Sequence, residues 1–464
     1  MELSNRRQFI KTAAAAVASF NIVPRHVLGG PGHVAPSEKV NVALVGAGGR
    51  GLGNLRELMQ LDDVQVIALA DPAESYSRSV RNHRSKCGRV PARAEIEKHY
   101  EAKTPNYRCA VYEDYRVMLE KEKAIDAVLC ATTDHVHAHI SIMAMRAGRH
   151  VYCEKPLTRT VEEARYVAQV ARETGVAAQM GNQGHSTLGI RRTVEYLRDG
   201  AIGTVREVHS WVSNGRYKPA LLGKPAESAP VPDGLNWDLW LGPAEHRAFN
   251  AAYFPVNWRD FWAFGCSTIG DFACHDLDAA TWAFDLRHPT RIEGLPVGPT
   301  NDEIGPHGSM IYYDFPARGD YPALKVNWYD GGLKPRAPEA LGNFPLPDRG
   351  VLFIGDKGAI ECDGAGGPPR LFPESLRAGY EKPAATLKRS AGHHRDWIDA
   401  CKGDESASSH FEYGARLTEI ALLGVLAIRA GRPIEWDAAA MRVKGLPEAE
   451  PLLRASYRKG WELM

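Results

Sequence analysis

Residues 40–55 read VNVALVGAGGRGLGNL, and the order of residue types in this stretch decides the fold. An apolar run stops at glycine, and Gly46, Gly48 and Gly51 follow with the spacing G-x-G-x-x-G before a helix-like segment. The first glycine permits a tight turn, the second lets a pyrophosphate approach the backbone, and the third lets the helix pack against the strand. The free N–H groups of the helix N-terminus favour phosphate there. The stretch predicts a dinucleotide site, with a purely structural turn as the alternative, and its residues are Gly46, Ala47, Gly48, Gly49, Arg50 and Gly51.

The next apolar strand, residues 64–70, ends at Asp71. An acidic residue about 20 residues beyond the glycines can bind the ribose 2′-hydroxyl of a dinucleotide. Asp71 therefore favours NAD over NADP, because a 2′-phosphate would face a carboxylate. Arg78 follows closely in the sequence and leaves NADP open.

The composition is that of a well-cored protein of more than one domain. The chain has 464 residues, of which 44% are hydrophobic, and two domains are the natural expectation at this length. The formal net charge of +1 gives no indication of nucleic acid as a partner. The eight cysteines are scattered and contain no C-x-x-C pair, so neither a disulfide framework nor a metal site is predicted.

The N-terminal segment carries Arg6 and Arg7, followed by Phe9, Ile10 and Lys11 and then by an alanine-rich stretch. This pattern resembles a bacterial twin-arginine (Tat) export signal, which implies the Tat machinery as a partner and a periplasmic location. A basic terminus with a chance pair of arginines is the alternative. We expect residues 1–35 to be signal and linker, and no stretch is apolar enough over sufficient length to be a stable membrane span.

Residues 38–184 alternate between strand-like and helix-like segments, which predicts a doubly wound parallel sheet, the Rossmann arrangement. Strands are expected at residues 124–131, 150–153 and 176–180, and a polar helix at 73–89. Ligands of such sheets bind at the carboxyl ends of the strands. One crevice should therefore collect Gly46, Asp71, Thr132, Lys155 and Gln183.

Beyond residue 184 the pattern changes. A long loop rich in proline and tryptophan, residues 218–258, is typical of a functional loop. Successive strands without helices between them predict a large open sheet that is mainly antiparallel, within a second α/β domain at 185–464. These strands are expected at 308–315, 323–330, 350–355 and 357–363, and a long helix at 411–430.

Three stretches together resemble the Gfo/Idh/MocA family, the relatives of glucose–fructose oxidoreductase and inositol dehydrogenase. They are the glycine loop, the segment Cys153-Glu154-Lys155-Pro156-Leu157, and residues 270–278, GDFACHDLD. The resemblance covers the chain from residue 39 onward. It implies an enzyme, an NAD(P)-dependent oxidoreductase that acts on a secondary CH–OH of a sugar, sugar derivative or cyclitol. It also implies that residues 185–464 bind substrate and form a homodimer or homotetramer.

Hydride removal from a CH–OH needs a base for the hydroxyl proton and a cation for the developing alkoxide. Lys155 can supply the cation, or the base if its surroundings favour the neutral amine. Asp271 and His275 are spaced i, i+4, so on a helix the carboxylate would lie beside the imidazole and orient it as a general acid/base. The structural alternatives are a Glu154–Lys155 ion pair and a buried histidine satisfied by an aspartate.

The histidine-rich stretch TTDHVHAH, residues 132–139, opens a helix at the expected crevice. The resemblance places His135 and His137 beside the dinucleotide, together with Thr132, Thr133 and Glu154. A metal is not predicted, because no cysteine or glutamate joins these histidines at ligand spacing.

Other residues are expected around the nicotinamide and the substrate. Gln183 and His185 follow a strand end, in a segment that departs from commoner family sequences. Trp258 and Arg259 should close the pocket from the long loop, where an aromatic face can stack on a sugar ring.

Three functions follow from these residues. The first is a sugar or cyclitol dehydrogenase. The second is an NAD-dependent glycosidase or lyase, in which transient oxidation of the sugar permits elimination of the glycosidic group and the hydride is then returned. The export signal favours this redox-neutral alternative, because free NAD is scarce outside the cytoplasm. The third is a non-catalytic carbohydrate-binding protein with bound nucleotide, and the intact Lys155, Asp271 and His275 weigh against it.

Overall fold

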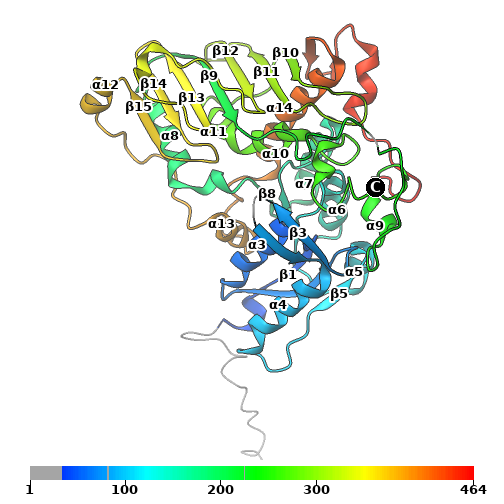
Figure 1. Cartoon of the computed structure of the whole chain (residues 1–464). Coiled ribbons are helices and arrows are strands. Elements are labelled where there is room, and N and C mark those ends of the chain that lie inside the picture. Colours follow the sequence, from blue (N-terminus) through cyan, green and yellow to red (C-terminus); the bar gives the residue numbers. More distant parts are fainter. Residues whose placement is uncertain (1–33, 81–82, 224, 464) are drawn as a thin grey trace, which may run out of the picture.

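The structure is a computed structural model that describes residues 34–80, 83–223 and 225–463 (Figure 1). The expected export signal therefore falls almost entirely outside the described residues. Within them, no helix combines the length and the apolarity that crossing a bilayer requires.

The N-terminal part is built on a six-stranded sheet, and each neighbouring pair of strands is parallel. The strand order is β5-β2-β1-β6-β7-β8. The strands are β1 (Val40–Val45), β2 (Val64–Ala70), β5 (Ala110–Tyr112), β6 (Ala127–Cys130), β7 (His150–Glu154) and β8 (Ala178–Gly181). The prediction of a doubly wound parallel sheet is confirmed.

Helices cover both faces of this sheet because strand side chains alternate between the faces. Val42 and Leu44 pack with helices α3 (Gly49–Met59) and α4 (Arg89–Glu101). Ala43 packs on the other face with α5 (Tyr115–Lys121), α6 (Asp134–Arg146) and α7 (Val161–Thr174). Helix α7 begins with a Thr160–Glu163 capping box and ends at the left-handed Gly175, which are the signals expected at helix ends.

The predicted helix at residues 73–89 is wrong. The chain instead forms a hairpin of β3 (Tyr76–Val80) and β4 (His83–Cys87) that lies beside the Rossmann sheet (Figure 1). The segment is rich in serine, which favours turns and helix caps over helix interiors. Tyr76 also packs edge-on against Phe254 of the long loop, with ring centroids 4.7 Å apart. Tertiary contact therefore stabilises the hairpin.

The C-terminal part is built on a nine-stranded sheet of order β15-β14-β13-β9-β12-β11-β10-β16-β17. Only β9 and β12 are parallel neighbours, so the expectation of a mainly antiparallel sheet is confirmed. The strands are β9 (Val205–Val212), β10 (Arg291–Val297), β11 (Gly308–Phe315), β12 (Leu324–Tyr329), β13 (Arg349–Gly355), β14 (Ala359–Cys362), β15 (Pro369–Phe372), β16 (Ile434–Asp437) and β17 (Arg442–Val443).

The α-helices of this part lie between the two sheets (Figure 1), whereas the described segment 331–348, with its 3-10 helix Glu339–Leu341, packs on the other face of the large sheet beside Trp211 and Leu352. These α-helices include α8 (Leu188–Arg198), α10 (Ser267–Asp276), α11 (Asp278–Ala283) and the 20-residue α14 (Phe411–Ala430). Helix α14 packs on β8 of one sheet and on β10 of the other, and one hydrophobic core runs through both domains. The catalytic candidates on α10 are thereby held against the carboxyl end of β7.

Three further α-helices are short: α9 (Trp237–Leu241), α12 (Glu374–Gly379) and α13 (His393–Cys401). Trp397 and Ile398 of α13 are fully buried in the core of the Rossmann part, and Trp240 of α9 lies in the aromatic cluster of the long loop.

Candidate active site

The glycine loop has the close backbone contacts that its sequence predicts. Gly46 has φ 91°, and a Cβ there would lie 2.6 Å from the carbonyl oxygen of Ala131. A Cβ on Gly51 would lie 2.0 Å from the carbonyl oxygen of Gly46, so helix α3 could not approach the loop with a larger residue. Gly48 precedes the helix without any side-chain cap, which leaves the helix N-terminus to a ligand. These features fit a dinucleotide pyrophosphate.

Asp71 directly follows β2, and its carboxylate is hydrogen-bonded to the glycine loop. One carboxylate oxygen accepts from the N–H of Ala47 at 2.7 Å and the other accepts from the N–H of Ala73 at 2.7 Å. Burial raises the pKa of Asp71 to about 6, and these two hydrogen bonds act in the opposite direction. Each oxygen retains a lone pair for a ribose hydroxyl.

Two adjoining cavities lie along the carboxyl edge of the Rossmann sheet. The first, of about 960 Å³, is lined by Gly46, Gly48, Gly49, Asp71 and Thr133 and is covered by aromatic side chains, including Trp240, Trp258 and Trp461. The second, of about 1210 Å³, is lined by Glu154, Lys155, Gln183, Asp271 and His275. Five residues line both cavities: Arg50, Arg78, Ala131, Thr132 and Arg259. The cavities therefore form one elongated site, of a shape that suits the two halves of a dinucleotide.

Lys155 and Asp271 form the centre of the second cavity. The Nζ of Lys155 lies 2.5 Å from Oδ1 of Asp271, and it also donates to the Asp271 backbone carbonyl. The hydroxyl of Tyr217 donates to Oδ2 of Asp271 at 2.5 Å, and the Nε of Arg259 lies 3.3 Å from Oδ1. Burial alone would raise the pKa of Asp271, but Lys155 and Arg259 outweigh it and hold this pKa well below its usual range.

His275 lies one helical turn after Asp271 on α10 and lines the same cavity. The expected Asp271–His275 hydrogen bond does not form, because the carboxylate is engaged by Lys155, Tyr217 and Arg259. Among the described residues, the buried Nδ1 of His275 has no hydrogen-bond partner. Burial, and then the charges of Lys155 and Arg349, lower the pKa of His275 well below its usual value, so the ring is neutral rather than poised near pH 7.

Glu154 and Gln183 support the glycine loop from the second cavity. Oε1 of Glu154 accepts from Asn54 Nδ2 at 2.7 Å, from Arg50 Nε at 3.2 Å and from Gln183 Nε2 at 2.7 Å. The predicted residues Glu154, Gln183 and Arg50 are therefore brought together in one network beside Lys155.

Two predicted site histidines lie away from both cavities. The Nε2 of His135 contacts the Leu241 carbonyl at 3.1 Å, and its ring packs against Trp240 and Phe264. His185 contacts Asp278 at 3.0 Å and stacks on Trp282 at 4.3 Å. Neither ring lines a cavity. Both are buried and have structural roles, because they contact residues of α9 and α11 that are distant in the sequence.

The other predicted residues divide into lining and supporting positions. His137 lines the second cavity, although its Nδ1 bonds the Pro156 carbonyl at 2.8 Å. Trp258 lines the first cavity, with the guanidinium of Arg259 4.1 Å above its ring. Ala47 and Gly51 line neither cavity. Ala47 donates its N–H to Asp71, and Gly51 packs against the carbonyl of Gly46.

Two side chains that line this site, Tyr217 and Asp134, are not assigned to it from the sequence, and Arg78 is considered there only in relation to NADP. Tyr217 and Asp134 line the second cavity, and Arg78 of the hairpin lines both. In the part of the chain that the structure describes, the Arg78 guanidinium lies over Gly49 and has no hydrogen-bonded or ion-paired partner. Its position at the junction of the cavities suits a pyrophosphate. Because residues 73–89 were predicted to form a helix, the position of Arg78 over the glycine loop could not be predicted. No sequence motif around Tyr217 indicates that it belongs to the site.

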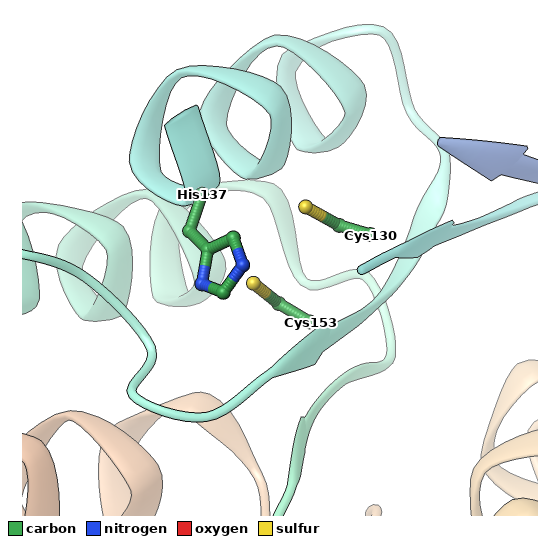
Figure 2. A group of neighbouring side chains, drawn as sticks. All are labelled: Cys130, His137 and Cys153. Carbon is green, nitrogen blue, oxygen red and sulfur yellow. The ribbon is translucent and has the colours of Figure 1, made fainter. Parts of the chain in front are cut away.

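No metal is predicted from the sequence, yet the structure brings cysteine and histidine side chains together at one point. Cys130, His137 and Cys153 offer ligand atoms that all lie within 4.8 Å of one another (Figure 2). This group lies at the ends of β6 and β7, next to the first turn of α6, and is distinct from the cluster around Asp271.

Comparison with known proteins agrees with this geometry. Residues 40–182 match the oxidoreductase family model described as an NAD-binding Rossmann fold, GFO_IDH_MocA, and residues 202–306 match that family's C-terminal α/β domain. A 1,5-anhydro-D-fructose reductase of Ensifer adhaerens is 32% identical over 126 residues, which are 27% of this chain and 37% of the relative. A glycosyl hydrolase family 109 protein of Stenotrophomonas maltophilia is 30% identical over 198 residues, which are 43% of this chain and 40% of the relative.

The chain thus spans less than half the length of these curated relatives where it matches them. The fold extends further. The WlbA dehydrogenase from Bordetella pertussis, solved in complex with NADH and UDP-GlcNAcA, aligns over 86% of this chain and 99% of its own, with a TM-score of 0.57 and 15% identity. The two family models and the glycine loop they contain show that the chain belongs to the Gfo/Idh/MocA family of oxidoreductases, with an NAD-binding Rossmann domain.

Proposed function

We propose that the protein is an NAD-dependent oxidoreductase that acts on a secondary CH–OH of a sugar, sugar derivative or cyclitol. The observation that carries the proposal is the Lys155–Asp271 pair, which lies in a cavity continuous with the dinucleotide cavity. The reductase and dehydrogenase among its relatives support a carbohydrate substrate.

The dinucleotide would be held by the glycine loop, by Asp71 at the ribose, and by Arg50 and Arg78 at the pyrophosphate. When bound, NAD supplies the acceptor for the hydride of the substrate carbon. The ammonium of Lys155 donates a hydrogen bond to the substrate oxygen and stabilises negative charge that develops there. His275 lines the same cavity with a neutral ring, and we assign it the role of accepting the hydroxyl proton. Asp271 orients Lys155 and remains anionic.

A redox-neutral glycosidase is the second candidate, and the match to a family 109 glycosyl hydrolase favours it. The same Lys155 and His275 would serve a transient oxidation of the sugar. Elimination of the glycosidic group, addition of water and return of the hydride would complete hydrolysis without cofactor turnover.

One experiment separates these functions. The purified protein, with the nucleotide it retains, is incubated without added cofactor with free sugars, cyclitols and glycosides. Absorbance of reduced nicotinamide and release of free sugar are followed together. A lasting band limited to one turnover per chain supports the dehydrogenase. Many turnovers of glycoside cleavage without a lasting band support the glycosidase. If neither signal appears while the nucleotide stays bound, the protein does not act on the tested sugars, and the result favours a carbohydrate-binding protein.

We also propose that the protein is exported by the Tat pathway to the periplasm, on the strength of Arg6 and Arg7. Fractionation of cells that express the wild type or the Arg6→Lys/Arg7→Lys variant tests this. Periplasmic wild type and cytoplasmic variant support export, and equal distribution contradicts it.

We further propose that the protein forms a homo-oligomer through the face of the large sheet that lies opposite the α-helices between the two sheets. Met310 and Tyr312 on β11 are only partly buried on this face, where Met310 packs beside the cluster of Trp211 and Tyr329 and Tyr312 lies edge-on to Tyr329. Light scattering after gel filtration should give a multiple of the 51.0 kDa chain, reduced to one chain in Tyr312→Lys. A monomeric wild type would contradict the proposal.

A further inference from the structure

Two cysteines and one histidine converge behind the catalytic lysine. Cys130 is the last residue of β6, and Cys153 is its direct partner on the parallel strand β7. In-register neighbours project to the same face of a sheet, so both sulfurs point toward helix α6, whose first turn carries His137. Figure 2 shows the imidazole directed toward the two sulfur atoms, and the ligand atoms of all three lie within 4.8 Å of one another.

The histidine already has the tautomer that a metal ligand requires. Its Nδ1 lies 2.8 Å from the carbonyl oxygen of Pro156. A carbonyl only accepts, so Nδ1 carries the proton and Nε2 carries the lone pair. His137 is 1% exposed, and among the described residues its Nε2 has no hydrogen-bond partner. A backbone carbonyl that orients a ligating imidazole is the usual second partner of a metal-bound histidine.

The donor set and the burial limit the choice of ion. Two sulfurs and one imidazole suit zinc or cuprous copper, and they do not suit magnesium or calcium, which prefer oxygen. Both cysteines are fully buried. Because an uncompensated charge is costly in such a core, a divalent ion with two thiolates and a neutral imidazole, which sum to zero, is favoured. Ser141, one turn beyond His137, has a buried hydroxyl beside Cys153 that can donate to its thiolate.

We propose that Cys130, His137 and Cys153 form a binding site for one Zn²⁺ ion. Binding releases the two thiol protons and forms two Zn–S bonds and one Zn–N bond. The ion ties the ends of β6 and β7 to the first turn of α6, and Glu154 and Lys155 follow Cys153 directly. The ion would therefore have a structural role next to Lys155, at the end of β7. This role does not depend on which sugar the enzyme binds.

Cobalt substitution tests the proposal, because Co²⁺ bound by thiolate gives charge-transfer absorption that oxygen and nitrogen ligands do not. The full chain is stripped with a chelator, titrated with Co²⁺ and then back-titrated with Zn²⁺. We expect one Co²⁺ per chain with a two-thiolate band, release of two protons, and displacement by Zn²⁺. Cys130→Ser and Cys153→Ser should each weaken binding at least about tenfold and halve the thiolate band, whereas the control Cys362→Ser, a buried cysteine on β14, should leave both unchanged.

Several results would overturn the proposal. One is a wild type that shows no thiolate band with micromolar Co²⁺. Another is a band that persists at full intensity in Cys130→Ser. A third is a thiol count in denaturant that falls two short of the eight cysteines, which would mean a Cys130–Cys153 disulfide. The wild-type spectrum decides even if a variant fails to fold, and folding of each variant is checked by its retained NAD.

Discussion

The ammonium of Lys155 and the carboxylate of Asp271 lie 2.5 Å apart, although 116 residues separate them in the sequence. Lys155 follows the end of a Rossmann strand, and Asp271 lies on α10 of the second domain. The reaction centre therefore exists only when the two domains pack through their shared core.

Replacing Lys155 with methionine should lower kcat at least about 100-fold while NAD stays bound. The substitution removes the cation that stabilises the substrate alkoxide, and removing one such donor costs roughly 100- to 1,000-fold. Steady-state kinetics and the nucleotide content of the purified variant check this. Lys218→Met, at an exposed lysine beside the site, is the matched control and should retain full activity. Activity near the wild-type level in Lys155→Met would contradict the mechanism.

Tyr217→Phe should lower kcat/KM by roughly 10- to 100-fold, because it removes the O–H that donates to Oδ2 of Asp271. A hydrogen bond to a charged group contributes about 1.5–3 kcal/mol. Its loss raises the pKa of Asp271 and frees the carboxylate to move away from Lys155. Tyr321→Phe, at a tyrosine outside the site, serves as control. An unchanged kcat/KM would show that Lys155 and Arg259 alone hold Asp271.

Arg78→Ala should accelerate loss of NAD, because this guanidinium faces the junction of the two cavities. A charge-assisted hydrogen bond to the pyrophosphate implies a dissociation constant at least about tenfold higher. NAD retained after gel filtration, and titration of the stripped protein, measure the effect. The control is Arg84→Ala, at an exposed arginine on the facing strand of the same hairpin. Equal retention in both variants would place Arg78 outside the cofactor site.

Asp134→Asn should stabilise the protein at neutral and higher pH. Burial raises the pKa of Asp134 to about 7, and the nearby Arg259 lowers it only in part. The unfolded carboxyl titrates near 3.9, so between about pH 4 and 7 the folded state holds a proton that the unfolded state has lost. This carboxyl therefore contributes stability at low pH that declines as the pH rises toward 7.

The stability advantage of Asp134→Asn over the wild type should therefore grow from pH 4 to 7, by up to about 4 kcal/mol, at about 1.36 kcal/mol per pH unit. Denaturant unfolding of both proteins at several pH values measures the difference. A gap that stays constant with pH would mean that Asp134 is ionised throughout.

Several elements could be predicted because local chemistry decides them. The glycine spacing from Gly46 to Gly51, the predicted helix at residues 411–430, which is α14, and the strand at 308–315, which is β11, need no distant partner to be recognised. Glycine conformation, helical periodicity and strand alternation act over a few residues. The Glu154–Lys155–Pro156 segment likewise marks the second cavity from sequence alone.

Other features depended on contacts that no short stretch contains. Strand β3 contacts Phe254 through Tyr76, and His135 and His185 contact Leu241 and Asp278. Asp271 has the i, i+4 spacing that predicts contact with His275, yet the charges of Lys155 and Arg259 attract its carboxylate more strongly than a neutral ring does.

The sequence by itself determined the Rossmann unit, its dinucleotide loop and the residue types of the reaction centre, because these rest on backbone conformation and on spacing along one strand or helix. Only the tertiary structure decided that Tyr217 and Arg78 join the site, that His275 is neutral, and that Cys130 and Cys153 meet at His137. Charge pairing, burial and the register of neighbouring strands act between residues far apart in the chain. The Lys155–Asp271 centre forms when the two domains pack together, whereas Cys130, Cys153 and His137 meet within the Rossmann domain.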